Sequence, residues 1–207
     1  CKGDIVSSNA FMRHFISAEK LPESYNTLAE TYYLPILAAI VAKQKESKKP
    51  FVIGVNGTQG SGKSTVSALF VAALKSIYGL TAYSLSIDDF YLTKAERIAL
   101  AEKVHPLLLT RGVPGTHDIE LANATLDQLT ARKPTTIPRF NKATDDRHPP
   151  KNFSIANDPA DVIILEGWCV GATPQTASEL ETPANPFEKE KDSDCTWRKY
   201  VNQCLQE

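Results

Sequence analysis

The sequence predicts an α/β fold, in which a parallel sheet carries helices on both faces. Short apolar runs typical of buried strands alternate with longer segments whose apolar residues recur at helical spacing, and this alternation favours parallel strands. A glycine-rich turn joins one of the strand-like runs directly to the helix that follows it. Because 207 residues fit one domain, we expect a single domain over residues 1–207, with a helical segment at about 1–49.

The expected strands and helices follow from this alternation. Apolar, β-branched runs predict strands at 51–55, 81–87 and 161–165, and a short one at 135–140. Helical periodicity predicts helices at 26–42, 63–78, 94–104, 118–132 and 196–207. Gly79 is a natural helix stop and Asp118 a natural N-cap. We expect loops at 105–117 and 141–158, and a mobile insertion rich in Thr, Pro, Glu, Asp and Ser at 172–194.

Composition excludes several classes of protein. Apolar residues make up 42% of the chain and the net charge is −1, so a disordered chain is excluded and nucleic acid is not an expected partner. No apolar stretch approaches the length of a membrane span and no leader peptide is evident, so no membrane partner is expected either.

The cysteines and the ends of the chain complete this first interpretation. Cys1, Cys169, Cys195 and Cys204 match no metal-binding spacing, and reduced thiols in a cytoplasmic protein are expected. Because the sequence starts at Cys1 instead of Met and the last helix shows no stop signal, we also expect it to be a fragment of a longer chain.

The glycine-rich turn matches the phosphate-binding pattern G-x-x-x-x-G-K-[ST] in full. It follows the strand 51–55 and opens the helix 63–78, as this motif requires. Its glycines let backbone N–H groups point inward, where they and the positive end of the helix hold phosphate oxygens. The expected nucleotide-binding residues are Gly57, Thr58, Gln59, Gly60, Ser61, Gly62, Lys63, Ser64 and Thr65.

The glycine-rich turn is therefore a phosphate-binding loop, or P-loop, and it predicts ATP and Mg²⁺ as cofactors. Lys63 would reach the β- and γ-phosphates, and the hydroxyl of Ser64 is the expected magnesium ligand. A GTPase would need an Asn-Lys-x-Asp motif, whereas the nearest match, at 141–144, ends in Thr. A mechanical or transport ATPase is usually a larger oligomeric chain. A small-molecule kinase therefore fits the motif best.

Carboxylates follow two of the predicted strands. Asp88 and Asp89 come at the carboxyl end of the strand 81–87, and Glu166 follows 161–165. Ligands of open α/β sheets bind at this edge. A kinase needs a carboxylate that accepts the hydroxyl proton, and an acidic residue that orients magnesium. From position alone, Asp88 or Asp89 could accept the hydroxyl proton, but could equally cap the helix that follows. Glu166 fits the role of orienting magnesium.

Two loops carry arginines that could bind an anionic acceptor. One is the segment 111–118 and the other is 138–142, which is followed by Asp145-Asp146-Arg147-His148. The planar guanidinium suits carboxylate or phosphate. Ordinary exposed loop charge remains the alternative for each arginine taken alone.

Together these strings resemble the D-glycerate 3-kinase family, a relative of uridine kinase, phosphoribulokinase and bacterial pantothenate kinase. The P-loop is shared by many families. The other matching strings are Asp88-Asp89-Phe90-Tyr91, Arg111-Gly112-x-Pro114-Gly115-Thr116-His117-Asp118, Pro138-Arg139-Phe140 and Glu166-Gly167-Trp168. The second and the last of these occur in far fewer families, and the combination of all the strings carries the resemblance. The resemblance covers roughly residues 10 to 207. The lid helix and the adenine-binding segment of such kinases are not recognisable before Glu207, so the resemblance implies that a C-terminal portion is missing.

The resemblance implies roles for individual residues. Asp88 would be the catalytic base, acting with Lys63 and Glu166, and Ser64 and Glu166 would hold Mg²⁺. The acceptor side would comprise Asp89, Tyr91, Arg111, His117 and Arg139. Strand pleating would turn Asp88 towards the P-loop and Asp89 away from it.

The predicted function is ATP-dependent transfer of the γ-phosphoryl group to a hydroxyl of a small molecule, with D-glycerate as the leading acceptor. A uridine-kinase-like or pantothenate-kinase-like phosphotransferase is one alternative. The other is a nucleotide-binding regulatory protein without turnover.

Overall fold

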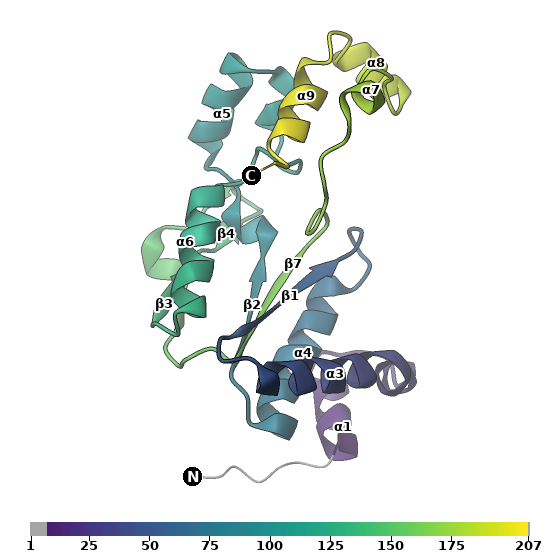
Figure 1. Ribbon diagram of the computed structural model, residues 1–207, viewed down its shortest axis with the longest axis vertical. Coiled ribbons are helices and arrows are strands. Elements are labelled where there is room, and N and C mark those ends of the chain that lie inside the picture. The colour runs from purple at the N-terminus through teal and green to yellow at the C-terminus, as the bar shows by residue number, and fades with distance from the viewer. Residues whose placement is uncertain (1–7, 207) are drawn as a thin grey trace. The chain divides into compact units, whose positions relative to one another are not determined.

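A computed structural model describes residues 8–206 (Figure 1). The described chain forms two compact units. The first comprises the described part of Cys1–Ser86 together with Thr125–Thr136 and Ile155–Trp168. The second comprises Ile87–Ala124, Ile137–Ser154 and the described part of Cys169–Glu207. Cys1 lies outside the described residues, and the expectation of a single domain stays a prediction.

A parallel three-stranded sheet forms the centre of the first unit. Its order is β1–β7–β2, with β1 at Phe51–Asn56, β7 at Val162–Gly167 and β2 at Ala82–Ser86. Both Phe51 and Ala82 lie opposite Val162 in register. Strand β7 is paired on both sides, and its apolar run 162–164 is fully buried, as a continuous run of β-branched residues predicts.

Helices of the first unit bury the apolar side of this sheet. They are α1 (Ser8–Ala18), α2 (Ser24–Leu28), the π-helix η1 (Ala29–Tyr33), α3 (Leu34–Glu46) and α4 (Lys63–Tyr78). Helix α4 packs against all three strands, α3 against β1, and α1 against α4 (Figure 1). Met12, Leu37, Leu69 and Leu74 are fully buried in the shared core. The predicted parallel sheet with helices is confirmed.

Two details of the first unit differ from the sequence prediction. The helix expected at 26–42 runs from Ser24 to Glu46 and contains the π-helical turn, which has no sequence signal. Strand β1, expected to be buried, is only half-buried on one face, and on its other face Val52 is 48% exposed. Gly79 ends α4 in the left-handed conformation as predicted, at φ 66°.

The second unit is built from short elements. They are the 3₁₀ turn η2 (Ile87–Phe90), α5 (Lys94–Lys103), η3 (Pro106–Leu109), β4 (Phe140–Asn141), β5 (Asp146–Arg147), η4 (Pro150–Asn152), α7 (Ala177–Leu180), α8 (Pro186–Lys191) and α9 (Thr196–Gln203). Helix α6 (Ile119–Thr130) runs from the second unit into the first, and β3 (Thr135–Ile137) pairs with β6 (Ser154–Ala156). Asp118 caps α6 by accepting from the Leu121 N–H, as predicted.

Several predictions for this part of the chain are wrong. The expected loop 141–158 contains β5, η4 and β6, and the strand expected at 135–140 breaks after Ile137. The insertion 172–194 contains α7 and α8 and the fully buried Asp192, and its mobility stays a prediction. Helix α9 ends at Gln203 and does not continue to the last residue.

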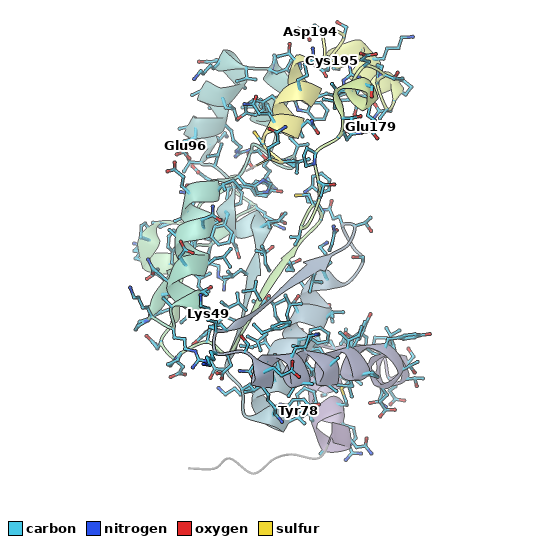
Figure 2. All side chains as sticks on the ribbon, viewed as in Figure 1. Lys49, Tyr78, Glu96, Glu179, Asp194 and Cys195 are labelled. Atoms are coloured by element: carbon cyan, nitrogen blue, oxygen red, sulfur yellow. The ribbon has the colours of Figure 1, made fainter. Side chains whose placement is uncertain are left out.

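Local capping explains why these short helices form. Glu96 and Glu179, labelled in Figure 2, close capping boxes with Thr93 and Thr176, the residues that precede α5 and α7. Each glutamate accepts from the backbone N–H of its threonine at 2.7 Å. A box of this kind satisfies two helix N–H groups that otherwise lack partners. Among residues 8–206 there is no helix with both the length and the apolar character needed to cross a membrane.

Gly115 provides a test of packing within the second unit. A Cβ at this position would lie 2.6 Å from Tyr200 Cε1 and 2.9 Å from Cys204 Sγ. Gly171 has a similar positive φ and open space around it. Both Gly115→Ala and Gly171→Ala therefore carry a left-handed backbone cost of about 1–2 kcal/mol. We expect Gly115→Ala to lose about 1–3 kcal/mol more through overpacking against α9. Urea unfolding of both variants checks this, and equal losses would contradict it.

Candidate functional site

The P-loop curls between β1 and the first turn of α4. Gly60 and Gly62 adopt φ values of 77° and 88°, a region that side chains disfavour. A Cβ at Gly57 would lie 2.7 Å from Ser61 Oγ and 3.2 Å from Lys63 Cγ. Lys63 Nζ donates to the Thr58 carbonyl at 2.9 Å, so its ammonium group lies across the loop. The glycines are therefore needed for the backbone conformation at 60 and 62 and for space at 57.

The first turn of α4 contacts the end of the central strand. Ser64 Oγ donates to Glu166 Oε1 at 3.1 Å, and Glu166 is only 6% exposed. A hydroxyl beside a buried carboxylate is an oxygen donor set of the kind that magnesium prefers. The residues of the first unit thus fit a nucleotide phosphate at the P-loop and Mg²⁺ at Ser64 and Glu166.

The paired aspartates lie in the second unit, in η2. Strand β2 ends at Ser86, before either aspartate. The expectation that strand pleating turns Asp88 and Asp89 to opposite sides is therefore wrong, because both residues lie in a 3₁₀ turn. Asp89 accepts from Arg139 Nη1 at 2.6 Å and from the Phe140 N–H at 3.1 Å. Both of its oxygens are therefore engaged with the segment that leads into β4.

Asp88 receives a donor on each carboxylate oxygen. Tyr91 Oη donates to Oδ1 at 3.1 Å, and Lys142 Nζ donates to Oδ2 at 2.6 Å. Burial by itself raises the pKa of Asp88, but the hydrogen bonds and the charge of Lys142 outweigh it, and this pKa lies below its usual value. The carboxylate is thus ionised and held in one orientation, while it is still about one third exposed.

Tyr91, which donates to this carboxylate, belongs to a cluster of three aromatic rings. The rings of Tyr91 and His117 stack at 4.4 Å, and Phe140 meets Tyr91 edge-on at 5.4 Å. Burial first, and then Asp88, raises the pKa of Tyr91, so the phenol remains a donor at neutral pH. Burial lowers the pKa of His117 to about 4 against the opposing effect of Asp88. His117 is therefore neutral at pH 7, and its Nε2 has no hydrogen-bond partner among the described residues.

The two arginines predicted on the acceptor side have partners within the second unit. Arg111 Nη1 pairs with Asp145 Oδ1, and the guanidinium lies over the Phe140 ring at 5.5 Å. Arg139 joins Asp89 and also donates from Nε to Ser154 Oγ at 2.9 Å. The structure thus brings Asp89, Tyr91, His117, Arg111 and Arg139 into one unit with Asp88. Their role toward a substrate stays a prediction.

Sequence reasoning assigned no individual role to three polar residues of this cluster. Lys142 pairs with Asp88, and Arg147 Nη2 donates to Asp118 Oδ2 at 2.9 Å. Arg97 is 1% exposed and donates to the Asp145 carbonyl at 2.6 Å. The sequence does not indicate that Arg97 in α5 is buried, because a single arginine in a helix is usually exposed. Lys142 lies in the charged segment 138–142, but its distance from Asp88 has no sequence signal.

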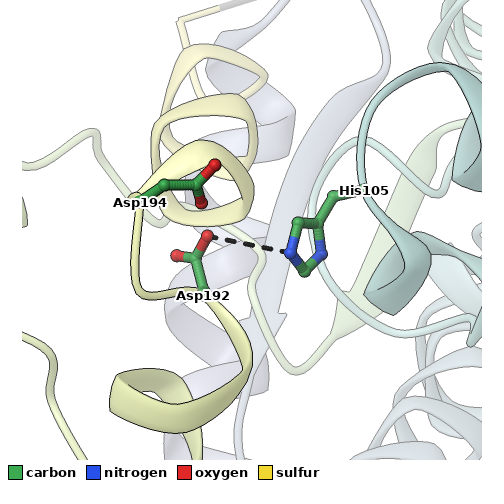
Figure 3. Close-up of side chains that lie close together, drawn as sticks. All are labelled: His105, Asp192 and Asp194. Atoms are coloured by element: carbon green, nitrogen blue, oxygen red, sulfur yellow. Dashed lines mark ion pairs between the residues drawn. The ribbon is translucent and has the colours of Figure 1, made fainter.

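A separate cluster of His105, Asp192 and Asp194 has metal-ligand residue types (Figure 3). His105 Nε2 lies 4.0 Å from Asp192 Oδ1. Asp192 is fully buried and accepts from Arg198 Nε at 3.0 Å and from the Trp197 N–H at 2.7 Å. These bonds fix the start of α9, so the cluster has a structural explanation that needs no metal.

The sheet order and the P-loop define a P-loop protein, and comparison with known proteins identifies the family. The chain belongs to the Phosphoribulokinase / Uridine kinase family, whose sequence profile matches residues 52–173. The family resemblance predicted from the motifs is confirmed at this level.

Individual relatives extend the similarity beyond the family profile. "Uncharacterized kinase mug58" of Schizosaccharomyces pombe is 35% identical in an alignment of 159 residues that covers 72% of this chain and 57% of that protein. "Probable ATP-dependent kinase TDA10" of Saccharomyces cerevisiae is 36% identical over 143 residues, 62% of this chain and 48% of that protein. The solved D-glycerate 3-kinase of Cryptococcus neoformans has a TM-score of 0.66 at 28% identity, over 82% of this chain and 64% of that one. The chain spans about half the length of the curated relatives it matches.

The lowered pKa of His117 predicts an acid-dependent loss of stability. The unfolded chain binds a proton at this residue near pH 6.5, whereas the folded chain does so only near pH 4. The unfolded state therefore binds more protons between these two pH values. As the pH is lowered through this window, the free energy of unfolding decreases, and this group contributes up to about 3 kcal/mol of the decrease. His117→Phe keeps a stacking ring without a titratable group, so its stability should fall less between pH 7 and pH 4.5 in urea unfolding.

An exposed histidine on α1, His14, is the matched control, and His14→Phe should lose stability with acid as the wild type does. Parallel losses for His117→Phe and the wild type would show that His117 is not held neutral in the folded protein.

Proposed function

We propose that the protein is an ATP- and Mg²⁺-dependent kinase that phosphorylates a hydroxyl of a small hydroxy acid, with D-glycerate as the leading acceptor. The single observation that carries this proposal is the contact between Ser64 of the P-loop and the buried Glu166. It supplies a phosphate-binding loop together with a carboxylate suited to magnesium. Membership of a kinase family and the likeness to a solved D-glycerate 3-kinase support the choice of reaction and acceptor.

The reaction would be an in-line displacement. The acceptor hydroxyl oxygen forms a bond to the γ-phosphorus, the bond from that phosphorus to the β–γ bridging oxygen breaks, and ADP leaves with that electron pair. Magnesium, when bound, offsets charge on the phosphate oxygens. Lys63 would hold the β- and γ-phosphates, and Asp88 would accept the proton of the hydroxyl. Asp89, Tyr91, Arg111, His117 and Arg139 are proposed to surround the acceptor.

Use of ATP and a small acceptor is consistent with a cytoplasmic protein, which we propose as its location. The absence of a basic excess in the sequence gives no support to a nucleic-acid partner.

The proposed function is tested by coupled ADP release from the purified protein. The panel of acceptors comprises D-glycerate, other short hydroxy acids, uridine and pantothenate. We expect turnover with a hydroxy acid, and we expect Lys63→Ala to abolish it while the circular dichroism spectrum and unfolding midpoint stay unchanged, because the hydrogen bond from Lys63 to the Thr58 carbonyl is exposed and lies within the loop. Turnover with uridine or pantothenate alone would contradict the hydroxy acid as acceptor and assign that compound instead. Nucleotide binding without turnover on any acceptor would favour a regulatory protein.

The neighbouring aspartates give a second test. Asp88→Asn keeps the shape of the side chain but removes its charge and its proton-accepting role. It should lower kcat by about 10²–10⁴-fold, the usual range for loss of a general base, with little change in the KM for ATP. Asp89→Asn is the matched variant, and it breaks an ion pair with Arg139. We expect Asp89→Asn to lower the unfolding midpoint, and to lower kcat less than Asp88→Asn does. Near-normal turnover of Asp88→Asn would remove this residue from the proposed mechanism.

A further inference from the structure

The cations near Asp88 differ in how many of their donors are already used. Four arginines of the second unit are paired with aspartates. Arg97 and Arg111 pair with Asp145, Arg139 pairs with Asp89, and Arg147 pairs with Asp118. Their side chains are between 1% and 36% exposed. Such arginines support the walls of a site, because breaking a pair to bind a ligand leaves a partly buried aspartate without its counter-charge.

Lys142 is in a different state. Its Nζ donates to Asp88 Oδ2 at 2.6 Å, yet its side chain is 62% exposed. An ammonium group has three N–H donors, so this contact with Asp88 leaves donors that can face a ligand. Lys142 follows β4 directly, and the backbone after it is turned by Asn141, whose Oδ1 accepts from the Ala143 N–H at 3.0 Å. The lysine is thus carried by an ordered turn.

The carboxylate beside Lys142 is equally well placed. Tyr91 donates to the other oxygen of Asp88, and the stack with His117 and the edge contact with Phe140 fix the Tyr91 ring. The Asp88 side chain is 32% exposed, so an alcohol can reach this carboxylate while Tyr91 and Lys142 stay in place. An acceptor for a hydroxyl and a donor for an anion therefore stand side by side.

We propose that Lys142 binds the anionic group of the phosphoryl acceptor while Asp88 receives its hydroxyl, so that this pair of side chains selects a short hydroxy acid. The proposal rests on the proposed kinase function. It assigns recognition of the anion to Lys142, and leaves Arg111 and Arg139 to hold the surrounding segments in place through Asp145 and Asp89.

The spacing of the two groups limits the size of the acceptor. Hydrogen bonds of about 2.8 Å from each group, added to the 2.6 Å between Lys142 Nζ and Asp88 Oδ2, place the hydroxyl and anionic oxygens of one ligand no more than roughly 8 Å apart. An acid of a few carbons meets this limit with both groups engaged. A neutral alcohol of the same length engages only Asp88.

The test compares two acceptors with the same carbon skeleton, one anionic and one neutral. Glycerate and its neutral amide, glyceramide, are each varied at saturating ATP with the wild type, Lys142→Met and Lys142→Arg. Lys151→Met, which changes an exposed lysine in η4 of the same unit, is the matched control. For Lys142→Met we expect the preference for glycerate over glyceramide, as a ratio of kcat/KM, to fall on the order of ten- to a hundredfold, the usual effect of losing one charge-assisted hydrogen bond. Lys142→Arg should restore most of it, and Lys151→Met should keep the wild-type ratio.

Equilibrium binding separates this inference from the proposed function. Calorimetric titration of glycerate into the protein, without turnover, should show weaker binding to Lys142→Met than to the wild type and Lys151→Met. If the wild type binds glycerate through Lys142 but transfers no phosphoryl group, the kinase proposal fails and the anion site stands. An unchanged acceptor ratio, an equal fall in kcat with both acceptors, or no glycerate binding by the wild type would each overturn the assignment of Lys142.

Discussion

The buried pairing of β7 between β1 and β2 is the constraint on which the first unit depends. Because 162–164 is buried on both faces and in register with both neighbours, the strand cannot slip without exposing a continuous apolar run. That register sets the position of Glu166 at the end of the strand. The Ser64 hydroxyl then meets the Glu166 carboxylate, and the helix that begins at Lys63 is tied to the sheet at the point where phosphate would bind.

Sequence reasoning succeeds where one local rule decides the structure. The strand–loop–helix context of the P-loop, the stop at Gly79 and the N-cap at Asp118 each depend on residues within a few positions of one another, and each is found as predicted. It fails where distant segments decide. The insertion 172–194 is too polar to suggest order, yet Asp192 is buried there because Arg198 and backbone N–H groups of α9 satisfy it.

The candidate site shows the same division. The residues that bear the chemistry could be chosen by type and by resemblance, and Asp88, Asp89, Tyr91, His117 and Arg139 do lie in one unit. Which charge pairs with which could not be predicted, since the charged partners of Asp88 and Asp89 are 54 and 50 positions away. Opposite charges within reach of one another offer several pairings, and only the fold decides between them.

This pairing has a physical consequence for how the second unit would handle a charged ligand. Aspartates at 88, 89, 118 and 145 each hold a cation, so the site is close to neutral while its polar groups are fixed. A fixed, nearly neutral arrangement costs little reorganisation when an anion arrives, which is the condition under which electrostatic groups contribute most to catalysis. The contact that an incoming anion can share at least cost is the exposed one, between Lys142 and Asp88, because solvent already reaches both side chains. Selectivity for charge and positioning of the hydroxyl would then depend on the same pair of residues.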